Sequence, residues 1–310
     1  MIVAISERPV ESSWIDEYRD SRAYSHLTED QLYSRYAALL ENVIAFEDSG
    51  CAFIARPFAP YWSKRLAWTE QEFRLRAAPE QLVAIQEREL KQPRPRVIAA
   101  RKLWSHIEQP PLGSYIVKFG KRAHVEEMLS KGRFRISPAT SYRDPSLNPA
   151  IRDDELNAQI MFPAGTRLSM QIDGEYKEVP NIIGPLCHTR HCENFYVFCA
   201  AGSFDPRLFD DFEADACLLV RDLNRFGLPL LREFSAVASM TKVVHGSVHY
   251  EDPLHPVREI HLVEMIKHFR YEYQREWRMV WNSEEPLSLT ATPIFVEIGS
   301  LADSCSAYYL

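Results

Sequence analysis

No stretch of this 310-residue chain is long and apolar enough to cross a membrane, since its longest apolar runs, such as residues 217–220, are short. Residues 1–8 lack the basic segment followed by an apolar core that marks a secretory signal. The six cysteines are scattered and do not show the spacing of a disulfide framework. We therefore expect a cytoplasmic protein that has no membrane partner.

The common catalytic signatures are also absent. The chain contains no G-x-G-x-x-G, no Walker loop, no H-E-x-x-H and no G-x-S-x-G motif, so no function follows from a short pattern. The only candidate metal ligands are the cysteines and histidines of residues 187–192. A zinc site would need a second ligand pair, which is missing, so we expect no metal and a loop in which Cys187 and Cys192 are buried thiols.

The composition is that of an ordinary globular protein, with 46% hydrophobic and 25% charged residues. The length favours two domains. A net charge of −7 argues against indiscriminate binding to nucleic acid, although residues 64–102 and 118–143 are locally basic. Either stretch could face an anion; alternatively, these basic side chains are simply solvated on helix faces.

The first third of the chain has helical patterning. Helices are expected to start at the capping box of residues 28–31, at 69–72, at Pro79 and at Val97. The two prolines and the glycine of residues 109–113 then predict a domain boundary. We expect a helical module over 1–112, which would bind a target or a partner, and a second domain over 113–310.

The second domain combines strands with helices, which predicts the α+β class. Strands are expected at 114–119, 133–137, 195–199, 216–220, 242–250 and 293–298. Helices are expected at 123–130, ending at Gly132, and at 223–238, entered through Asp222. Residues 138–154 form a long irregular stretch, and long loops in compact domains are often functional.

One segment near the end of the chain, residues 271–278, carries the most suggestive pattern. Taken as a strand, it places Glu272, Gln274, Glu276 and Arg278 on one face. A carboxylate beside an amide two residues earlier could bind a ribose diol and stabilise a developing sugar cation. Alternatively, this is the solvated face of a half-buried strand.

From Gly113 onward, about two-thirds of the chain, the order of motifs resembles the ADP-ribosyltransferase superfamily. More closely, it resembles a divergent bacterial branch frequent in phage-defence loci. Three segments carry the resemblance: the strand 115–119, the segment 132–145 with its serines, Tyr142 and Asp144-Pro145, and the segment 273–278 with Gln274 and Glu276.

The resemblance implies a split β core with flanking helices, NAD as the substrate that donates ADP-ribose, and a set of site residues. Transfer from NAD passes through an oxocarbenium-like sugar, which a nearby carboxylate stabilises. Glu276 would supply that carboxylate, and Gln274 would orient the acceptor or the ribose. The NAD contacts would come from Lys118, Phe119, Ser137, Tyr142 and Arg143, with Tyr142 stacking on the nicotinamide.

Other interpretations of these residues stay open. Many members of the superfamily carry Arg or His where this chain has Lys118, and residues 137–141 only loosely match the Ser-Thr-Ser pattern of the family. Tyr142 could instead be a packed loop anchor. Arg278 could form a structural ion pair with Glu276 or Glu272, which would mimic a site.

The resemblance implies a toxin that acts inside the bacterial cell in phage defence, on RNA or, less favoured, on protein. The basic residues 88–102 could follow a phosphate backbone, with Trp62, Trp68 and Trp104 as stacking groups. A protein antitoxin would then be expected to cover the basic entrance of residues 118–143. The alternative is a catalytically inactive module with the same fold, which senses a nucleotide or a phage protein.

Overall fold

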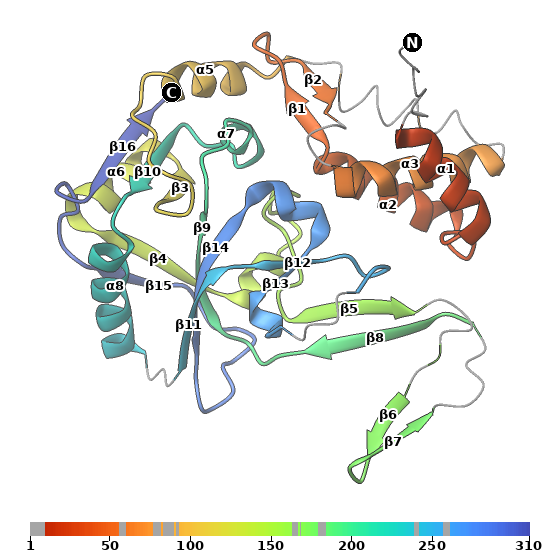
Figure 1. Cartoon of the computed structure of the whole chain (residues 1–310). Helices are drawn as coiled ribbons and strands as arrows, with labels where there is room; N and C mark the ends of the chain where they lie inside the picture. Colours follow the sequence, from red (N-terminus) through yellow and green to blue (C-terminus); the bar gives the residue numbers. More distant parts are fainter. Residues whose placement is uncertain are drawn as a thin grey trace, which may run out of the picture. The chain divides into compact units, whose positions relative to one another are not determined.

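The structure is a computed structural model of the whole chain. It describes residues 10–55, 60–76, 82, 90, 93–162, 167, 169–178, 184–238, 242–256 and 261–310. The chain divides into two compact units, residues 1–93 with 163–185 and residues 94–162 with 186–310. Helices and mainly antiparallel sheets are both present, so the predicted α+β class is confirmed (Figure 1). Within the described part of the chain, no helix combines the length and apolarity that a bilayer crossing requires.

The first unit is mainly helical. Its described elements are α1 (Val10–Ser21), α2 (Glu29–Glu41), α3 (Pro60–Leu75), the hairpin of β1 (Ile44–Phe46) with β2 (Ala52–Ile54), and the hairpin of β6 (Ser169–Ile172) with β7 (Glu175–Glu178). The predicted capping box is confirmed, because Thr28 and Gln31 exchange hydrogen bonds between side chain and backbone in both directions.

Two of the predicted helix starts in this unit are not confirmed. The start predicted at 69–72 is wrong, since these residues lie in the middle of α3. The Thr69 hydroxyl there donates to the Arg65 carbonyl, four residues earlier, at 2.8 Å, instead of capping a new helix. The helix predicted from Pro79 lies outside the described residues, apart from 82 and 90.

A buried carboxylate, Glu72 on α3, links α3 to α1 and to the residue that follows α1. It accepts hydrogen bonds from Tyr18 Oη at 2.5 Å, from Arg22 Nε at 3.0 Å and from Arg76 Nε at 2.8 Å. Burial alone would raise the pKa of Glu72, but the hydrogen bonds from Arg22, Tyr18 and Arg76 outweigh it, so this pKa lies below its ordinary value.

Replacing Glu72 with alanine is therefore expected to lower the free energy of unfolding of this unit by about 1–3 kcal/mol, because the buried Tyr18 hydroxyl and the partly exposed Arg22 and Arg76 lose their shared carboxylate. Since folding lowers the pKa of Glu72, its contribution is present above the ordinary value of 4.5 and is lost as the pH falls. Urea unfolding followed by tryptophan fluorescence measures the loss. The control Glu17→Ala removes an exposed ion pair and should cost less than about 1 kcal/mol; equal losses would contradict the prediction.

The second unit is built on an eight-stranded antiparallel sheet. Its strands are β3 (Ile116–Gly120), β4 (Arg133–Pro138), β9 (Tyr196–Ala201), β10 (Ala216–Val220), β11 (Lys242–Ser247), β14 (Glu276–Asn282), β15 (Ile294–Glu297) and β16 (Cys305–Tyr309). Six of them follow the order β11-β14-β9-β3-β10-β16, while β4 pairs with both β9 and β15. Each predicted strand has a counterpart in this sheet, but the strand predicted over 242–250 ends at Ser247, and His249–Glu251 form a separate strand paired outside this sheet.

The remaining elements of the second unit surround this sheet. They are α5 (Pro95–Trp104), α6 (Arg122–Lys131), α7 (Arg207–Asp211), α8 (Leu223–Val237), the 3₁₀ helices η2 (Ala139–Arg143), η3 (Val263–Met265) and η4 (Phe269–Gln274), and the strand pairs β5 (Asn157–Phe162) with β8 (Leu186–His191) and β12 (His249–Glu251) with β13 (Ile266–His268).

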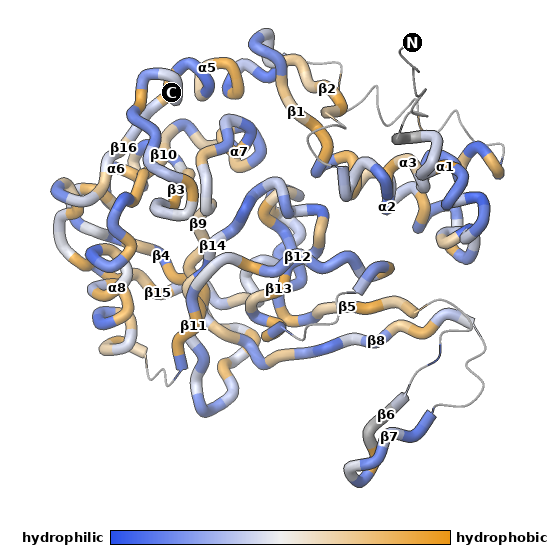
Figure 2. Tube along the Cα trace, viewed as in Figure 1, coloured by the Kyte–Doolittle hydropathy of each residue, from blue (hydrophilic) through white to orange (hydrophobic). Residues whose placement is uncertain are grey.

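Both faces of the sheet are covered, and β10 shows why its sequence is a continuous apolar run. Leu218 and Val220 point into one core, which also contains residues of α6 and α8, while Cys217 and Leu219 point into another, which contains residues of α5 and α7. Figure 2 shows apolar and hydrophilic residues alternating along α8, as expected for a helix with one face on the core.

The predicted ends of two helices are confirmed. Gly132 follows α6 with a φ of 62°, in the left-handed region, and a Cβ there would meet the Gly299 carbonyl oxygen at 2.2 Å, so only glycine fits. Asp222 caps α8, because its Oδ1 accepts hydrogen bonds from the backbone nitrogens of Asn224 and Arg225 at 3.0 Å.

The domain boundary predicted between 112 and 113 needs correction, because the two units divide between Pro93 and Arg94. Helix α5 belongs to the second unit. Its Ala100 is fully buried in the core that contains Phe119, and Arg94 pairs with Asp211 of α7 at 3.0 Å. The prolines and the glycine of residues 109–113 follow the end of α5 at Trp104, but they do not decide which core that helix packs against.

Candidate active site

The second unit contains a pocket that opens where the sheet divides. One edge of β9 pairs with β14 from Tyr196 to Ala201. The other edge is shared, since β4 pairs only with Tyr196 and Val197 and β3 pairs only with Ala201. Residues 198–200 therefore lie between two diverging strands, and they line a pocket of about 760 Å³. This volume is typical of a site for a small molecule or a cofactor.

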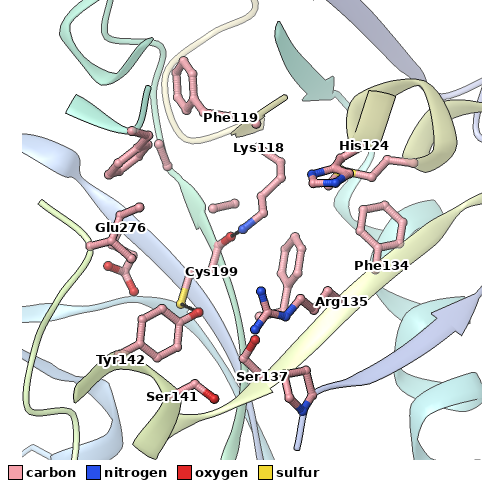
Figure 3. A pocket seen from close by; sticks show the side chains of 18 of the residues that line it. Lys118, Phe119, His124, Phe134, Arg135, Ser137, Ser141, Tyr142, Cys199 and Glu276 are labelled. Carbon is pink, nitrogen blue, oxygen red and sulfur yellow. Dashed lines mark hydrogen bonds between the residues drawn. The ribbon is translucent and has the colours of Figure 1, made fainter. Parts of the chain in front are cut away.

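Most of the predicted site residues line this pocket, although they are far apart in the sequence. Lys118 and Phe119 come from β3, Ser137 comes from β4, and Glu276 begins β14 (Figure 3). Tyr142 on η2 and Gln274 at the end of η4 also line it. The structure thus brings six of the seven predicted residues together, while the role of each stays a prediction.

The seventh residue, Arg143, is not among the residues that line the pocket. Its side chain is exposed and pairs with Asp154 at 2.5 Å. The reason is the 3₁₀ helix η2, whose tight turns direct Tyr142 and Arg143 differently. The prediction that Arg143 contacts NAD is therefore not supported by its position.

The strand predicted over residues 271–278 is wrong in its first half. Residues Phe269–Gln274 form η4, and Arg275 has a φ of 45°, in the left-handed region, so that β14 begins only at Glu276. The Arg275 carbonyl accepts a hydrogen bond from Gly202 N at 2.6 Å, which holds this turn in place. Gln274 and Glu276 nevertheless share a neighbour, because Lys267 Nζ donates hydrogen bonds to both side chains.

Glu276 is buried, with 6% of its surface exposed, and both of its oxygens are paired. Oε2 accepts a hydrogen bond from Lys267 Nζ, and Oε1 accepts one from Arg278 Nε at 2.5 Å. Burial alone would raise the pKa of Glu276, but the charges of Arg278 and Lys267 outweigh it and hold this pKa well below its usual range. Glu276 is therefore ionised at neutral pH even though its side chain is almost fully buried.

Arg278, which is fully buried, holds a second carboxylate. Its Nη2 lies 2.6 Å from Glu155 Oε2, and Glu155 is itself 4% exposed and lines the pocket. Burial raises the pKa of Glu155 to about 7, and the charges of Arg278 and Lys267 offset this only in part. One guanidinium thus binds two buried carboxylates of different acidity.

Glu155 and Lys267 were missed from the sequence. Glu155 stands in the acidic run 153–155, which is indistinguishable from a solvated loop, and Lys267 lies in a short apolar stretch where a lysine gives no signal by itself.

The side-chain amide of Gln274 is largely occupied by hydrogen bonds within the protein. Its Nε2 donates to the Ala150 carbonyl at 2.7 Å and to Tyr273 Oη at 3.2 Å, while its Oε1 lies 3.4 Å from Lys267 Nζ. Tyr271 Oη also donates to the Arg152 carbonyl, at 2.5 Å. These bonds fasten the predicted irregular stretch of residues 138–154 onto η4, so that it forms one wall of the pocket.

The basic side chains form a second region of the pocket. Lys118 Nζ donates to the Cys199 carbonyl at 2.6 Å, on the edge of β9 that no strand covers. Burial lowers the pKa of Lys118, and the nearby charge of Arg135 acts in the same direction. Arg135 is exposed, and among the described residues no acidic side chain pairs with it. In Figure 3 it lies between Lys118 and Ser137.

Tyr142 lies deeper in the pocket than a surface loop residue would. Its hydroxyl points toward Cys199 Sγ at 3.9 Å, a distance typical of a weak contact to sulfur (Figure 3). Burial raises the pKa of Tyr142 well above its ordinary value and the pKa of Cys199 to about 12, so both groups stay protonated at neutral pH. Tyr142 thus offers the pocket a neutral aromatic ring.

The tryptophans predicted as stacking groups for RNA are occupied in other ways. Trp62 and Trp68 are buried in the first unit, with 6% and 9% of their surface exposed. Trp104 stacks on Phe204 with ring centroids 4.0 Å apart. Arg88 and Lys91 lie outside the described residues, and Arg94 pairs with Asp211.

The segment of Cys187 and Cys192 also differs from the prediction. Residues 186–191 form strand β8, paired with β5, and Cys187 is exposed, so the expected loop with two buried thiols is wrong. In the described part of the chain, no group of three or more His, Cys, Asp or Glu side chains is arranged to hold a metal ion.

The raised pKa of Glu155 gives a testable dependence of stability on pH. The folded state favours the protonated carboxyl, so this contribution is present below the ordinary value of 4.5 and is lost as the pH rises through about 7. From about pH 5 to about pH 8, wild-type protein should lose more stability than Glu155→Gln, whose amide stays neutral. Thermal unfolding across this range checks the prediction, and parallel curves for the two proteins would contradict it.

Comparison with known proteins gives no relative from which a function could be taken: no protein family, no characterised protein and no solved structure matches this chain. The function must therefore be argued from the pocket and from the chemistry of its residues.

Proposed function

We propose that this protein is an NAD-dependent ADP-ribosyltransferase, whose pocket binds NAD at the split of the sheet. In this proposal it acts as a toxin inside the bacterial cell, in phage defence. RNA is the favoured target and protein is the second choice.

The observation that carries the proposal is the ionised carboxylate of Glu276 inside the pocket. Cleavage of the bond between nicotinamide and ribose develops positive charge on the sugar, and a fixed carboxylate stabilises that charge in a site from which water is excluded. Lys267 and Arg278 keep Glu276 ionised and immobile. A carboxylate held in this way needs no reorganisation when the sugar cation forms.

The other parts of the pocket suit the other parts of a dinucleotide. Tyr142 provides an aromatic ring for the cationic nicotinamide. Lys118 and Arg135 provide positive charge for the diphosphate. Phe119, Phe134 and Phe198 are buried aromatic residues among those that line the pocket, and they provide apolar surface for a base or a ribose.

The division of the sheet supports the finer fold proposal, a split β core like that of the ADP-ribosyltransferases. Strands β3 and β4 leave the same edge of β9 at different ends, so a ligand can reach the middle of β9. Helices α6 and α8 then flank one side of the core.

A second candidate function is the catalytically inactive sensor of a nucleotide or a phage protein. It is favoured by one observation, that both oxygens of Glu276 already accept hydrogen bonds from Lys267 and Arg278. Such pairing is also what a structural ion pair requires. Turnover separates the two candidates, because a sensor binds NAD or another nucleotide without releasing nicotinamide.

The proposal of an RNA target now rests on the family resemblance and on the exposed basic side chains of α5, Arg96 and Lys102. The proposed antitoxin would cover the basic entrance of residues 118–143, because blocking the entrance to NAD stops the reaction with every target. Charge complementarity there would mainly increase the association rate.

The deciding experiment incubates the purified chain with NAD labelled in the adenosine part and a bacterial lysate, and analyses the RNA and protein fractions separately. Label in either fraction, together with released nicotinamide, supports the transferase. A Glu276→Gln control should label neither fraction. If the wild-type chain binds NAD but releases no nicotinamide with any fraction, the sensor is the better account.

Charge reversal of Arg135 is expected to weaken NAD binding. Because Arg135 has no acidic partner among the described residues, Arg135→Glu should raise the KM for NAD by about 10- to 100-fold, the cost of losing hydrogen bonds to a charged group. Arg122→Glu on α6 is the control, because Arg122 is exposed and is not among the residues that line the pocket. Arg122 already pairs with Glu126 at 3.1 Å, so its reversal should change this KM by less than about fivefold. Equal effects of the two variants would contradict the assignment.

A further inference from the structure

The second carboxylate of the pocket, Glu155, has a geometry that a structural counter-ion for Arg278 does not explain by itself. Glu276 is shared by Arg278 and Lys267, so Glu155 also contributes to the charge balance of this buried cluster. Glu155 nevertheless lies in the wall of the pocket. Its Oε2 lies 2.6 Å from Arg278 Nη2, but neither of these two atoms makes a hydrogen bond to a described residue.

We propose that Glu155 is the general base that removes the proton of the acceptor when ADP-ribose is transferred. This inference rests on the proposed NAD chemistry and deepens it by assigning a second catalytic residue. Because Arg278 binds both carboxylates, Glu155 and Glu276 are held a short distance apart. Two carboxylates near the anomeric carbon are the arrangement by which enzymes divide stabilisation of a sugar cation from proton transfer.

The transfer breaks one bond at C1′ of the ribose and forms another. The bond between C1′ of the ribose and N1 of nicotinamide breaks, and its electron pair leaves with neutral nicotinamide. A lone pair of the acceptor oxygen, from a hydroxyl or from water, forms the new bond to C1′. The acceptor proton passes to the Glu155 carboxylate and later to solvent, while Glu276 stays ionised.

The surroundings of Glu155 suit this division of roles. A base works best when its pKa lies near the working pH, and the pKa of Glu155 is about 7, whereas that of Glu276 is far too low for a proton acceptor. The ionisable groups that face Glu155 from the packed elements are Arg278 and Glu276 of β14, Lys267 of β13, Asp153 of its own loop, Tyr142 of η2, Cys199 of β9, Cys192 and Tyr271.

The test measures nicotinamide release from NAD by the full chain as a function of pH, with water or azide as the acceptor. In water, kcat/KM for the wild-type chain should fall on the acid side with a midpoint near pH 7. Glu155→Gln should be about 100-fold or more slower at about pH 8, should lose this acid limb, and should leave the KM for NAD little changed. Asp154→Asn, which changes a carboxylate outside the pocket, should behave as wild type.

Azide as the acceptor distinguishes a general base from a residue that only stabilises the structure of the site. The azide anion carries no proton, so it needs no base, and it should restore nicotinamide release by Glu155→Gln at least about tenfold but should not rescue Glu276→Gln. With azide as the acceptor, the wild-type chain should also lose its acid limb, which tests the inference even if Glu155→Gln does not fold. A persistent acid limb with azide, or wild-type rates for Glu155→Gln across the pH range, would contradict the assignment of Glu155 as the general base. If the wild-type chain releases no nicotinamide at all, the proposed function fails and this inference fails with it.

Discussion

Glu276→Gln is expected to lower nicotinamide release from NAD by about 100-fold or more, because glutamine keeps the shape of the side chain but removes the charge that opposes the developing sugar cation. The same change should also lower the stability of the second unit. Lys267 and Arg278 are buried and lose a charged partner, and removing one member of a buried pair costs up to about 3–5 kcal/mol. Loss of activity alone would therefore be ambiguous.

A double variant resolves the ambiguity. Lys267→Met combined with Glu276→Gln removes the ammonium and the carboxylate together, and replacing both members of a buried pair is often neutral for stability. The double variant should therefore recover most of the unfolding free energy that Glu276→Gln loses, without recovering nicotinamide release. Thermal unfolding and the release assay on the same samples check this. Recovery of activity together with stability would show that the charge of Glu276 is not needed for the reaction.

Arg278→Met is expected to give the largest loss of stability in the second unit, about 3–5 kcal/mol or more, because two buried carboxylates lose their shared cation. Stability should also fall more steeply than in the wild type as the pH rises from about 5 to about 8. In the wild-type chain the pKa of Glu276 is lowered, so its contribution is constant in this range, and of these two carboxyls only Glu155 loses its contribution as the pH rises. Without Arg278, both carboxyls lose a neighbouring cation and their pKa values rise, so the variant should lose more stability as the pH rises.

Urea unfolding of Arg278→Met and of the wild type at about pH 5 and about pH 8 measures this difference in pH dependence. The deficit relative to wild type should be smaller at the lower pH, where the carboxyls take up protons. The control Arg232→Ala removes an exposed guanidinium of α8 and should cost less than about 1 kcal/mol at either pH. A deficit for Arg278→Met that does not depend on pH would mean that its cost comes from packing and not from charge.

Much of the secondary structure could be predicted from the sequence, because helix caps and helix ends depend on residues that are close together in the chain. The capping box at Thr28, the stop at Gly132 and the cap at Asp222 each depend on a few neighbouring residues, and the structure contains all three. The start predicted at 69–72 failed because the same residue types also occur inside a buried helix, where Thr69 bonds to its own helix backbone.

The site was accessible only in part, for a related reason. Glu276 could be recognised because Gln274 stands two residues before it, a pattern within one short segment. Glu155 and Lys267 could not, since their importance comes from partners that the fold brings near. The turn at Arg275 was also hidden, because a left-handed arginine has no mark in the sequence and is held there by a contact with Gly202.

The hydrogen bond from Gln274 to the Ala150 carbonyl spans 124 residues of the chain, and the one from Tyr271 to the Arg152 carbonyl spans 119. Contacts of such long range form late in folding, because the entropy of closing the intervening chain must be overcome first. During synthesis, the wall of the pocket can be fastened only after η4 and β14 have left the ribosome. A nascent chain that already contains β3, β4 and β9 would thus have several of the residues that line the pocket, but its site would not yet be complete.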